Sequence, residues 1–373
     1  MSQRQLAMVI NLDKCIGCQT CTVACSTHRL NHPGTEMLRY IWCETKPGEG
    51  WPKGWMEQGR KVPDRVRDYG GTWSFNWEEV YTSPVGTKYL HPVTKETGEP
   101  VKWGPIWEED QGAGEWPNGY FFYMPRLCNH CTDAPCIEVC KGHFARGGGL
   151  PSAQVNGHKN SMHKRDSDGI VTIDPSSCDE CGLCAAACPY KIPMENLVAG
   201  TYEMCDFCAG RVENQYAPVC AKSCPARGMY FGYLDDKQSF VAKLVNEYKV
   251  ALPLRPDFNT GPNVYYIPPF IRPTTFAADN KPTGQADIPT DLLRKYFGPG
   301  LDPAMATLKE HRARAERGEQ SELMDLLIIY KWADAFTPFK VLAPVEPIEQ
   351  GVEAAKGSLP IGPNVEASKG HQS

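Results

Sequence analysis

Residues 168–191 have the sequence DGIVTIDPSSCDECGLCAAACPYK, which combines a short apolar run with four closely spaced cysteines. Its start, Gly169–Asp174, predicts a short strand that leads into cysteines spaced C-x2-C-x2-C-x3-C. The small residues Ala185–Ala187, before the last cysteine, suit a short helix. The same unit opens the chain, where the apolar run Leu6–Leu12 precedes a run of equal spacing that begins at Cys15, and Thr20–Ala24 suits a second short helix. A strand followed by a cysteine loop is therefore an internal repeat.

The spacing of the cysteines predicts their chemistry. Sixteen of the 17 cysteines fall into four sets of four. Four thiolates bind one [4Fe–4S] cluster, and where two clusters are neighbours such a run gives three thiolates to one cluster and its fourth to the other. The sequence therefore predicts four iron–sulfur clusters. The sets are Cys15, Cys18, Cys21 and Cys25; Cys128, Cys131, Cys136 and Cys140; Cys178, Cys181, Cys184 and Cys188; and Cys205, Cys208, Cys220 and Cys224.

Zinc binding and disulfide formation are two other uses of cysteine. Zinc also binds four thiolates, usually from two separated C-x2-C pairs, and only the set that begins at Cys205 resembles that arrangement. A disulfide framework is typical of small secreted chains. This chain has 373 residues, 41% of them hydrophobic, and its start has no apolar segment typical of a signal peptide. Cys43 lies outside every set and is interpreted as a buried spare thiol.

Composition narrows the classes of function. The net charge is −5 with no basic run, so we expect no nucleic-acid partner. The longest apolar stretch, 323–330, is far shorter than the roughly 20 residues that span a bilayer, so no membrane span is expected. No nucleophile, phosphate-binding or dinucleotide-binding motif is present, so we expect no catalytic residue. His143, His158 and His163 are interpreted as loop histidines, and the stretch 143–163 as a partner-contacting loop or a solvated insertion.

The cysteine motifs resemble a known family. They are LAMVINLDKCIGCQTCTVAC (6–25), RLCNHCTDAPCIEVC (126–140), the stretch 168–191 and CDFCAGRVENQYAPVCAKSCPARGMYFG (205–232). Together they resemble the iron–sulfur beta subunit of the dimethyl sulfoxide reductase family of molybdopterin oxidoreductases. Three further segments resemble the branch that holds nitrate reductase, nitrite oxidoreductase, selenate and chlorate reductases, dimethyl sulfide dehydrogenase and ethylbenzene dehydrogenase. These segments are GPNVYYIPPF (261–270), LLRKYFGPGL (292–301) and SELMDLLIIYKWADAF (321–336).

The resemblance implies an electron-transfer subunit of a molybdenum-dependent complex typical of anaerobic respiration. It would relay single electrons through four clusters between a large molybdopterin catalytic subunit and a haem b, quinone-linked or membrane-anchor partner. The alternative is a free-standing polyferredoxin-type carrier. Such a carrier would usually lack an extension of the kind that follows the last cysteine, Cys224, so the extension favours the subunit.

The resemblance also implies which cysteines share a cluster. The fold is expected to be α+β, with two ferredoxin-like double-cluster modules, one nested in the other. The outer module is 1–25 with 200–250, the inner is 115–199, the Trp/Pro/Gly-rich insertion is 26–114 and the helical, partner-binding extension is 251–373. The implied ligand sets are Cys15, Cys18 and Cys21 with Cys224; Cys205, Cys208 and Cys220 with Cys25; Cys128, Cys131 and Cys136 with Cys188; and Cys178, Cys181 and Cys184 with Cys140.

One position departs from part of the family. Respiratory nitrate reductase and several relatives have a non-cysteine residue at the second position of the third set and hold a [3Fe–4S] cluster there. Cys181 occupies that position here, so four [4Fe–4S] clusters are expected, and a [3Fe–4S] cluster would follow only if Cys181 were not a ligand.

The expected location follows from where clusters are assembled. Thiolates receive their clusters in the reducing cytoplasm, so a chain without its own signal leaves only after folding, together with a partner that carries a twin-arginine signal. We therefore expect a periplasmic protein exported with its partner. The alternative is the cytoplasmic face of the membrane.

Overall fold

The computed structural model describes residues 4–29, 32–35, 38–48, 112–148 and 160–341, with short pieces at 50, 56, 73–75, 77–82, 84 and 92–94. The chain forms two compact units, Met1–Val341 and Leu342–Ser373, and the second lies outside the described residues. Most of the predicted insertion 26–114 and the centre of the stretch 143–163 also lie outside them.

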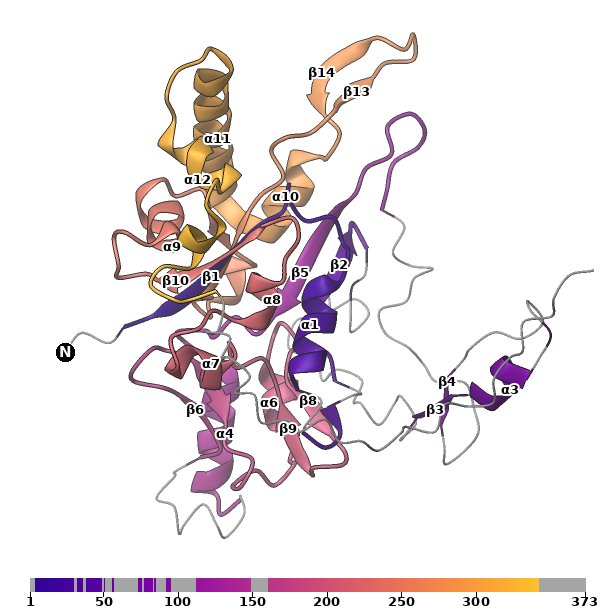
Figure 1. The fold of residues 1–373 in the computed structure, drawn as a ribbon, viewed down its shortest axis with the longest axis vertical. Coiled ribbons are helices and arrows are strands. Elements are labelled where there is room, and N and C mark those ends of the chain that lie inside the picture. The colour runs from indigo at the N-terminus through magenta and orange to yellow at the C-terminus, as the bar shows by residue number, and fades with distance from the viewer. Residues whose placement is uncertain are drawn as a thin grey trace, which may run out of the picture. The chain divides into compact units, whose positions relative to one another are not determined.

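Strand β1, Leu6–Asn11, is an inner strand of the largest sheet. All six of its residues are buried, as expected when apolar side chains occupy both faces of a strand. The sheet has the order β10-β1-β12-β11, in which β1 is antiparallel to β10 (Met229–Tyr233) and parallel to β12 (Val264–Ile267). Figure 1 shows β1 beside β10. Because β12 follows residue 250, this sheet joins the predicted outer module to the predicted extension.

The other sheets are two-stranded. The longest of them pairs β2 (Ile41–Lys46) with β5 (Phe122–Leu127), which ends just before the second cysteine set. The remaining two-stranded sheets pair β3 (Trp73–Phe75) with β4 (Pro92–Thr94), β6 (Met162–Lys164) with β7 (Val171–Ile173), β8 (Met194–Asn196) with β9 (Thr201–Glu203), and β13 (Thr274–Phe276) with β14 (Pro282–Ala286). Strand β11 (Leu252–Pro253) lies at the edge of the four-stranded sheet.

Short helices follow the cysteine loops. The two short helices expected from the sequence are confirmed as α1, Thr20–His28, and α6, Leu183–Ala187. The second set leads into α4, Pro135–Ala145, and the fourth into α7, Ala209–Glu213, and α8, Val219–Lys222. Helix α1 packs on α8, and α4 packs on α6 (Figure 1). These two helix pairs position the cysteines.

The helices beyond residue 250 are α10 (Thr290–Phe297), α11 (Leu301–Glu316) and α12 (Glu322–Ile328), and α11 is the longest helix that the structure describes. The shorter turns are α9 (Phe240–Ala242) and η4 (Lys243–Glu247) before residue 250, and η5 (Pro256–Phe258), η6 (Gly298–Gly300) and η7 (Trp332–Phe336) after it. Helix α12 ends at Ile328 because Ile329 adopts a left-handed conformation with φ of 56°. Within the described part of the chain, no helix combines the length and apolarity needed to cross a membrane.

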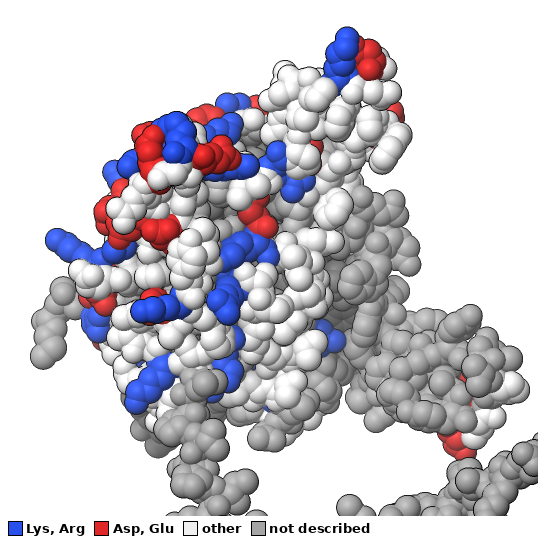
Figure 2. Space-filling view, turned by 45° about the horizontal axis from the view of Figure 1, so that its top comes forward, with Lys and Arg blue, Asp and Glu red and all other residues white. Residues whose placement is uncertain are grey.

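Charged side chains of both signs lie beside one another on the face shown in Figure 2. Some form exposed ion pairs, such as Arg294 with Asp302 at 2.9 Å and Arg312 with Glu316 at 2.8 Å. Exposed pairs of this kind contribute at most about 1 kcal/mol each, because water screens them. The stability of the fold therefore depends on its core and on buried pairs.

Candidate metal centres

The third and fourth cysteines of every set are four residues apart, and this spacing separates them by about one helical turn, roughly 5.4 Å of rise. One short helix can therefore supply thiols to two neighbouring sites. Helices α1 and α4 each contain both cysteines, whereas in the other two sets the second cysteine follows α6 or α8. The pairs are Cys21 and Cys25, Cys136 and Cys140, Cys184 and Cys188, and Cys220 and Cys224.

The same backbone conformation occurs in all four cysteine loops. The residue just before the second cysteine has a positive φ each time: 66° at Gly17, 43° at His130, 60° at Glu180 and 50° at Phe207. Residues other than glycine rarely adopt this conformation, so its fourfold occurrence identifies one repeated loop. The turn directs backbone N–H groups towards sulfur, as where the His130 N–H donates to Cys128 Sγ at 3.4 Å.

We name the four groups of cysteines that lie together in the structure. Two groups line cavities, and the other two are recognised by the electrostatic interactions among their thiols. Site 1 is Cys15, Cys18, Cys21 and Cys224; site 2 is Cys25, Cys205, Cys208 and Cys220; site 3 is Cys128, Cys131, Cys136 and Cys188; and site 4 is Cys140, Cys178, Cys181 and Cys184.

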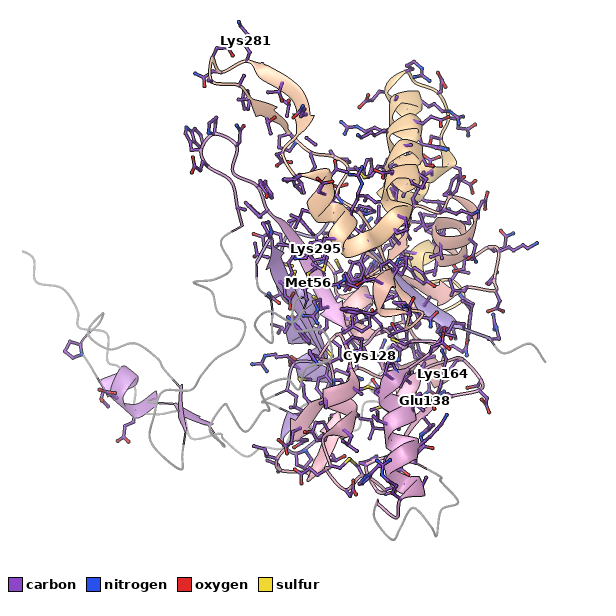
Figure 3. The ribbon with its side chains drawn as sticks, turned by 180° about the vertical axis from the view of Figure 1, so that it is seen from behind. Met56, Cys128, Glu138, Lys164, Lys281 and Lys295 are labelled. Carbon is purple, nitrogen blue, oxygen red and sulfur yellow. The ribbon has the colours of Figure 1, made fainter. Side chains whose placement is uncertain are left out.

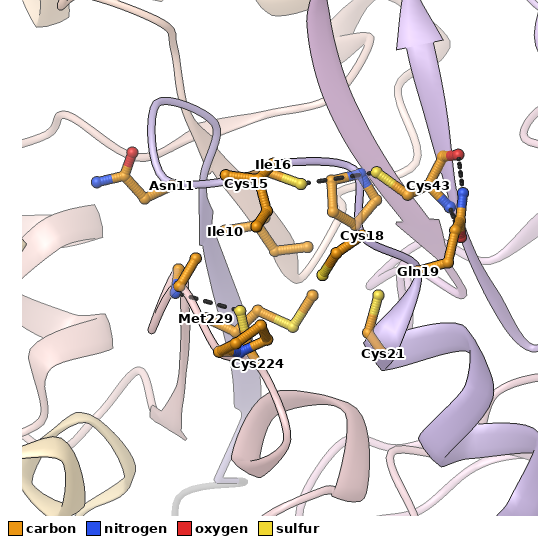
Figure 4. Close-up of a pocket in the computed structure, with 14 residues that line it drawn as sticks. Ile10, Asn11, Cys15, Ile16, Cys18, Gln19, Cys21, Cys43, Cys224 and Met229 are labelled. Atoms are coloured by element: carbon orange, nitrogen blue, oxygen red, sulfur yellow. Dashed lines mark hydrogen bonds between the residues drawn. The ribbon is translucent and has the colours of Figure 1, made fainter. Parts of the chain in front are cut away.

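All four thiols of site 1 line one cavity, which Figure 4 shows. Cys15 and Cys18 come from the loop after β1, Cys21 comes from the first turn of α1, and Cys224 comes from just beyond α8. The Gly228 N–H donates to Cys224 Sγ at 3.4 Å. The spare thiol predicted to be buried, Cys43 on β2, is 3% exposed and also lines this cavity. Its hydrogen bond lowers the pKa of Cys15.

Gly17 is closely packed against an aromatic ring. A Cβ at this position would lie 2.6 Å from the Tyr123 ring, and φ is 66°. We expect Gly17→Ala to displace the ring, distort the loop and reduce iron binding at site 1, at a cost above the roughly 1 kcal/mol that left-handed strain alone imposes. Gly200→Ala is a matched control, because Gly200 has φ of 65° and nothing within 4 Å of its Cβ position. Equal iron content and stability in the two variants would contradict this expectation.

Site 4 also lines a cavity, between α4 and α6. The Met162 N–H donates to Cys140 Sγ at 3.4 Å. His143 was expected in a loop, but the structure places it in α4, where Nε2 lies 2.5 Å from Asp179 Oδ2. With Cys181 these two side chains form a compact group of potential metal ligands. Sequence reasoning missed this group because 36 residues separate His143 from Asp179.

Sites 2 and 3 are identified by the effect that the charge of each thiol has on the pKa of its neighbours. Burial raises the pKa of Cys220 well above its usual value, and the charges of Cys208, Cys25 and Cys205 raise it further. Cys25 belongs to the first set in sequence, yet it acts on thiols of the fourth.

The same exchange occurs in the inner half of the chain. Burial raises the pKa of Cys136, and the charges of Cys188 and Cys131 raise it further. Burial also raises the pKa of Cys131. The charge of Cys188 raises it further, while other interactions lower it. The structure therefore brings Cys188, the last cysteine of the third set, close to two cysteines of the second set, Cys131 and Cys136.

Interactions between sites place them in series. The charge of Cys21 at site 1 acts on Cys220 at site 2. Cys205 at site 2 acts on Cys128 at site 3, and Cys184 at site 4 acts on Cys136 at site 3. The electrostatic neighbours thus run from site 1 to site 4 in numerical order.

Basic side chains lie beside the sites, and sequence reasoning did not find them. Lys164 Nζ donates to the Cys131 carbonyl oxygen at 3.1 Å, and Figure 3 shows Lys164 near Cys128. Burial lowers the pKa of Lys164, and the nearby cysteine charges oppose that change. Burial lowers the pKa of Arg29, but the charges of Asp206, with which it forms an ion pair, and of Cys25 and Cys205 outweigh that effect and favour the protonated form. These cations offset negative charge where thiolates gather.

The donor set fits iron–sulfur clusters. All 17 cysteines are free thiols, so none is used in a disulfide. Burial raises the pKa of most of them, and a metal ion reverses this effect because a coordinating thiol loses its proton. Repeated loops with N–H donors to sulfur, four thiols per site and nearby cations define an iron–sulfur protein with several clusters.

Comparison with known proteins identifies the family. The 4Fe-4S dicluster domain matches residues 120–234, and a 4Fe-4S binding domain matches residues 6–27. The chain is 39% identical to the selenate reductase subunit beta of Thauera selenatis and 39% identical to the dimethylsulfide dehydrogenase subunit beta of Rhodovulum sulfidophilum, over 90% of this chain and 99% of each relative. It is 41% identical to the respiratory nitrate reductase subunit beta of Haloferax mediterranei, over 87% of this chain and 90% of the relative.

The chain therefore belongs to the family of iron–sulfur beta subunits of molybdenum-dependent oxidoreductases. Its role is electron transfer within an enzyme complex, with a catalytic alpha subunit as partner. This result favours the subunit over the free-standing carrier.

Proposed function

We propose that the chain relays single electrons through four [4Fe–4S] clusters, one at each of sites 1 to 4, between a molybdopterin catalytic subunit and a haem or quinone-linked partner. When bound, such clusters accept and donate one electron at a time over a wide range of potentials. One observation carries the proposal: the cysteine pairs four residues apart divide between neighbouring sites, so each short helix links two clusters. The serial order of the sites supports a single path.

Each group of side chains has its own role in this relay. The sixteen thiolates hold the iron, and Cys181 completes site 4 as a [4Fe–4S] rather than a [3Fe–4S] centre. Backbone N–H groups that donate to sulfur, such as that of Gly228, stabilise the added negative charge of a reduced cluster. Arg29 and Lys164 act in the same direction at sites 2 and 3. Burial of most of the thiols excludes water from the path.

The nested arrangement is part of the proposal. Sites 1 and 2 belong to an outer module formed by residues 1–25 and 200–250, and sites 3 and 4 to an inner module formed by residues 115–199. Support comes from the two helix pairs, α1 with α8 and α4 with α6. We further propose that the complex is periplasmic through export with a signal-bearing partner, and that a haem or membrane-anchor subunit completes it.

The function is tested by anaerobic isolation of the protein from its native source. We expect a stoichiometric complex with a molybdopterin subunit, in which addition of the oxidised substrate to the reduced complex reoxidises all the clusters. A stable monodisperse monomer with full iron content and no oxidoreductase partner would instead support the free-standing carrier.

The ligand exchange between sets is tested with Cys25→Ser. This variant is expected to shift the EPR signal and potential of the cluster held by Cys205, Cys208 and Cys220, because a changed ligand alters cluster charge and hence potential. Cys208→Ser provides the reference for site 2, and Cys18→Ser provides it for site 1. If Cys25→Ser perturbed the Cys18 signal and left the Cys208 signal unchanged, each set would close its own cluster.

A further inference from the structure

Site 1 has five thiols within reach, although one cluster needs four. The fifth belongs to Cys43, which lies on β2 rather than in a cysteine loop. Cys43 Sγ lies 3.6 Å from Cys15 Sγ, within hydrogen-bond distance for two sulfur atoms. Figure 4 shows the Cys43 side chain directed at Cys15 from the edge of the cavity, opposite the side occupied by Cys224.

The position of Cys43 is fixed by two backbone hydrogen bonds. Its N–H donates to Gln19 Oε1 at 3.1 Å, and its carbonyl oxygen accepts from Gln19 Nε2 at 2.7 Å. Gln19 is itself held, because Thr22 Oγ1 donates to Gln19 Oε1 at 2.7 Å. Gln19 follows Cys18 directly, so these hydrogen bonds connect β2 to the cysteine loop. The distance between the two thiols therefore follows from the fold.

The chemistry of a cluster ligand decides which sulfur carries the proton. An iron ligand must be a thiolate, so Cys15 has no proton when it binds iron. The proton between the two sulfur atoms then belongs to Cys43, which is 3% exposed. Cys43 thus donates and Cys15 accepts.

We propose that Cys43 is a positioning residue that donates an S–H hydrogen bond to the Cys15 thiolate and raises the reduction potential of the cluster at site 1. The inference rests on the proposed function, because it requires a cluster at that site. A hydrogen bond to a ligand sulfur withdraws negative charge from the cluster and favours the reduced state, which carries one more electron. Cys43, on a strand outside the cysteine loops, then helps to set the reduction potential of the cluster at site 1.

The test uses the intact complex and potentiometric EPR titration. Cys43→Val removes the donor at similar volume, and we expect the potential of one cluster to fall while the iron content stays at the wild-type value. If the ratio of reduced to oxidised cluster at a fixed applied potential falls by up to tenfold, the reduction potential has fallen by up to about 59 mV. Cys43→Ser keeps a donor and is expected to lie between wild type and Cys43→Val. Ile41→Val, a buried change on the same strand, controls for packing and should shift nothing.

A second measurement detects the proton itself. Pulsed ENDOR on the wild-type cluster at site 1 should show an exchangeable proton coupling that disappears in D2O and is absent in Cys43→Val. Unchanged potentials together with an unchanged exchangeable coupling in Cys43→Val would overturn the proposal. Loss of about four irons in that variant would overturn it differently, by making Cys43 a ligand. Failure of the proposed function would instead appear in the wild type, as a missing cluster.

Discussion

Replacing Cys220 by Ala is expected to remove one complete cluster and stop electron flow through the complex. Cys220 lies in α8 and is 4% exposed, so neither water nor an added thiol can reach the vacated iron position. Site 2 lies between sites 1 and 3 in the proposed series, so electrons cannot pass between those two sites without it. The iron content should fall by about four atoms per chain.

Cys18→Ala is the matched control. Cys18 is the one exposed cysteine among the sixteen, so solvent or an added thiol can supply a ligand to iron at site 1. Iron analysis, EPR and turnover with the physiological electron partner should separate the two variants. Activity of the catalytic subunit with a dye that reaches it directly should persist in both. Full iron content and normal turnover in Cys220→Ala would contradict the assignment of site 2.

Glu44→Ala is expected to cost about 3–5 kcal/mol of stability, because it leaves two buried cations without their carboxylate. Glu44 on β2 is 1% exposed and accepts from Arg126 at 2.6 Å and from Lys46 at 3.0 Å. Arg126 also donates to the Tyr190 carbonyl oxygen, two residues beyond Cys188. The lost carboxylate should therefore weaken the β2–β5 pair and loosen site 3 as well.

This loss is large against a total stability of roughly 5–15 kcal/mol for a folded domain. Anaerobic urea unfolding, followed by the bleaching of cluster absorbance, should show a lower midpoint for Glu44→Ala. Glu316→Ala removes the exposed partner of Arg312 and should change the free energy of unfolding by no more than about 0.5 kcal/mol. Equal effects of the two substitutions would mean that the buried network contributes no more than a surface pair.

The sequence predicted those parts of the fold that depend on local patterns. The apolar run at Leu6 and the cysteine spacing predicted β1 and the loop after it, and the small residues before Cys188 predicted α6. These features depend on neighbouring residues. The apolar stretch 323–330 begins as helix α12, but Ile329 turns the chain and leaves Tyr330 71% exposed.

Features that depend on distant segments could not be predicted. Cys43 is 28 residues from Cys15, and no spacing rule connects a strand residue to a cysteine loop. The contact of Lys164 with the second set depends on the pairing of β6 with β7. The left-handed conformation of His130 and Phe207 was also hidden, because neither residue is a glycine that would mark it. Such arrangements arise from tertiary packing and not from local sequence.

The central claim is that this beta subunit holds four [4Fe–4S] clusters, and Mössbauer spectroscopy with iron and sulfide analysis of the anaerobically isolated complex tests it most directly. After subtraction of the iron and sulfide carried by the partner subunits, about sixteen iron atoms and an equal number of labile sulfides are expected per beta chain, all in [4Fe–4S] clusters. About twelve irons, a zinc atom in place of one cluster, or a [3Fe–4S] component in the enzyme as isolated would contradict it.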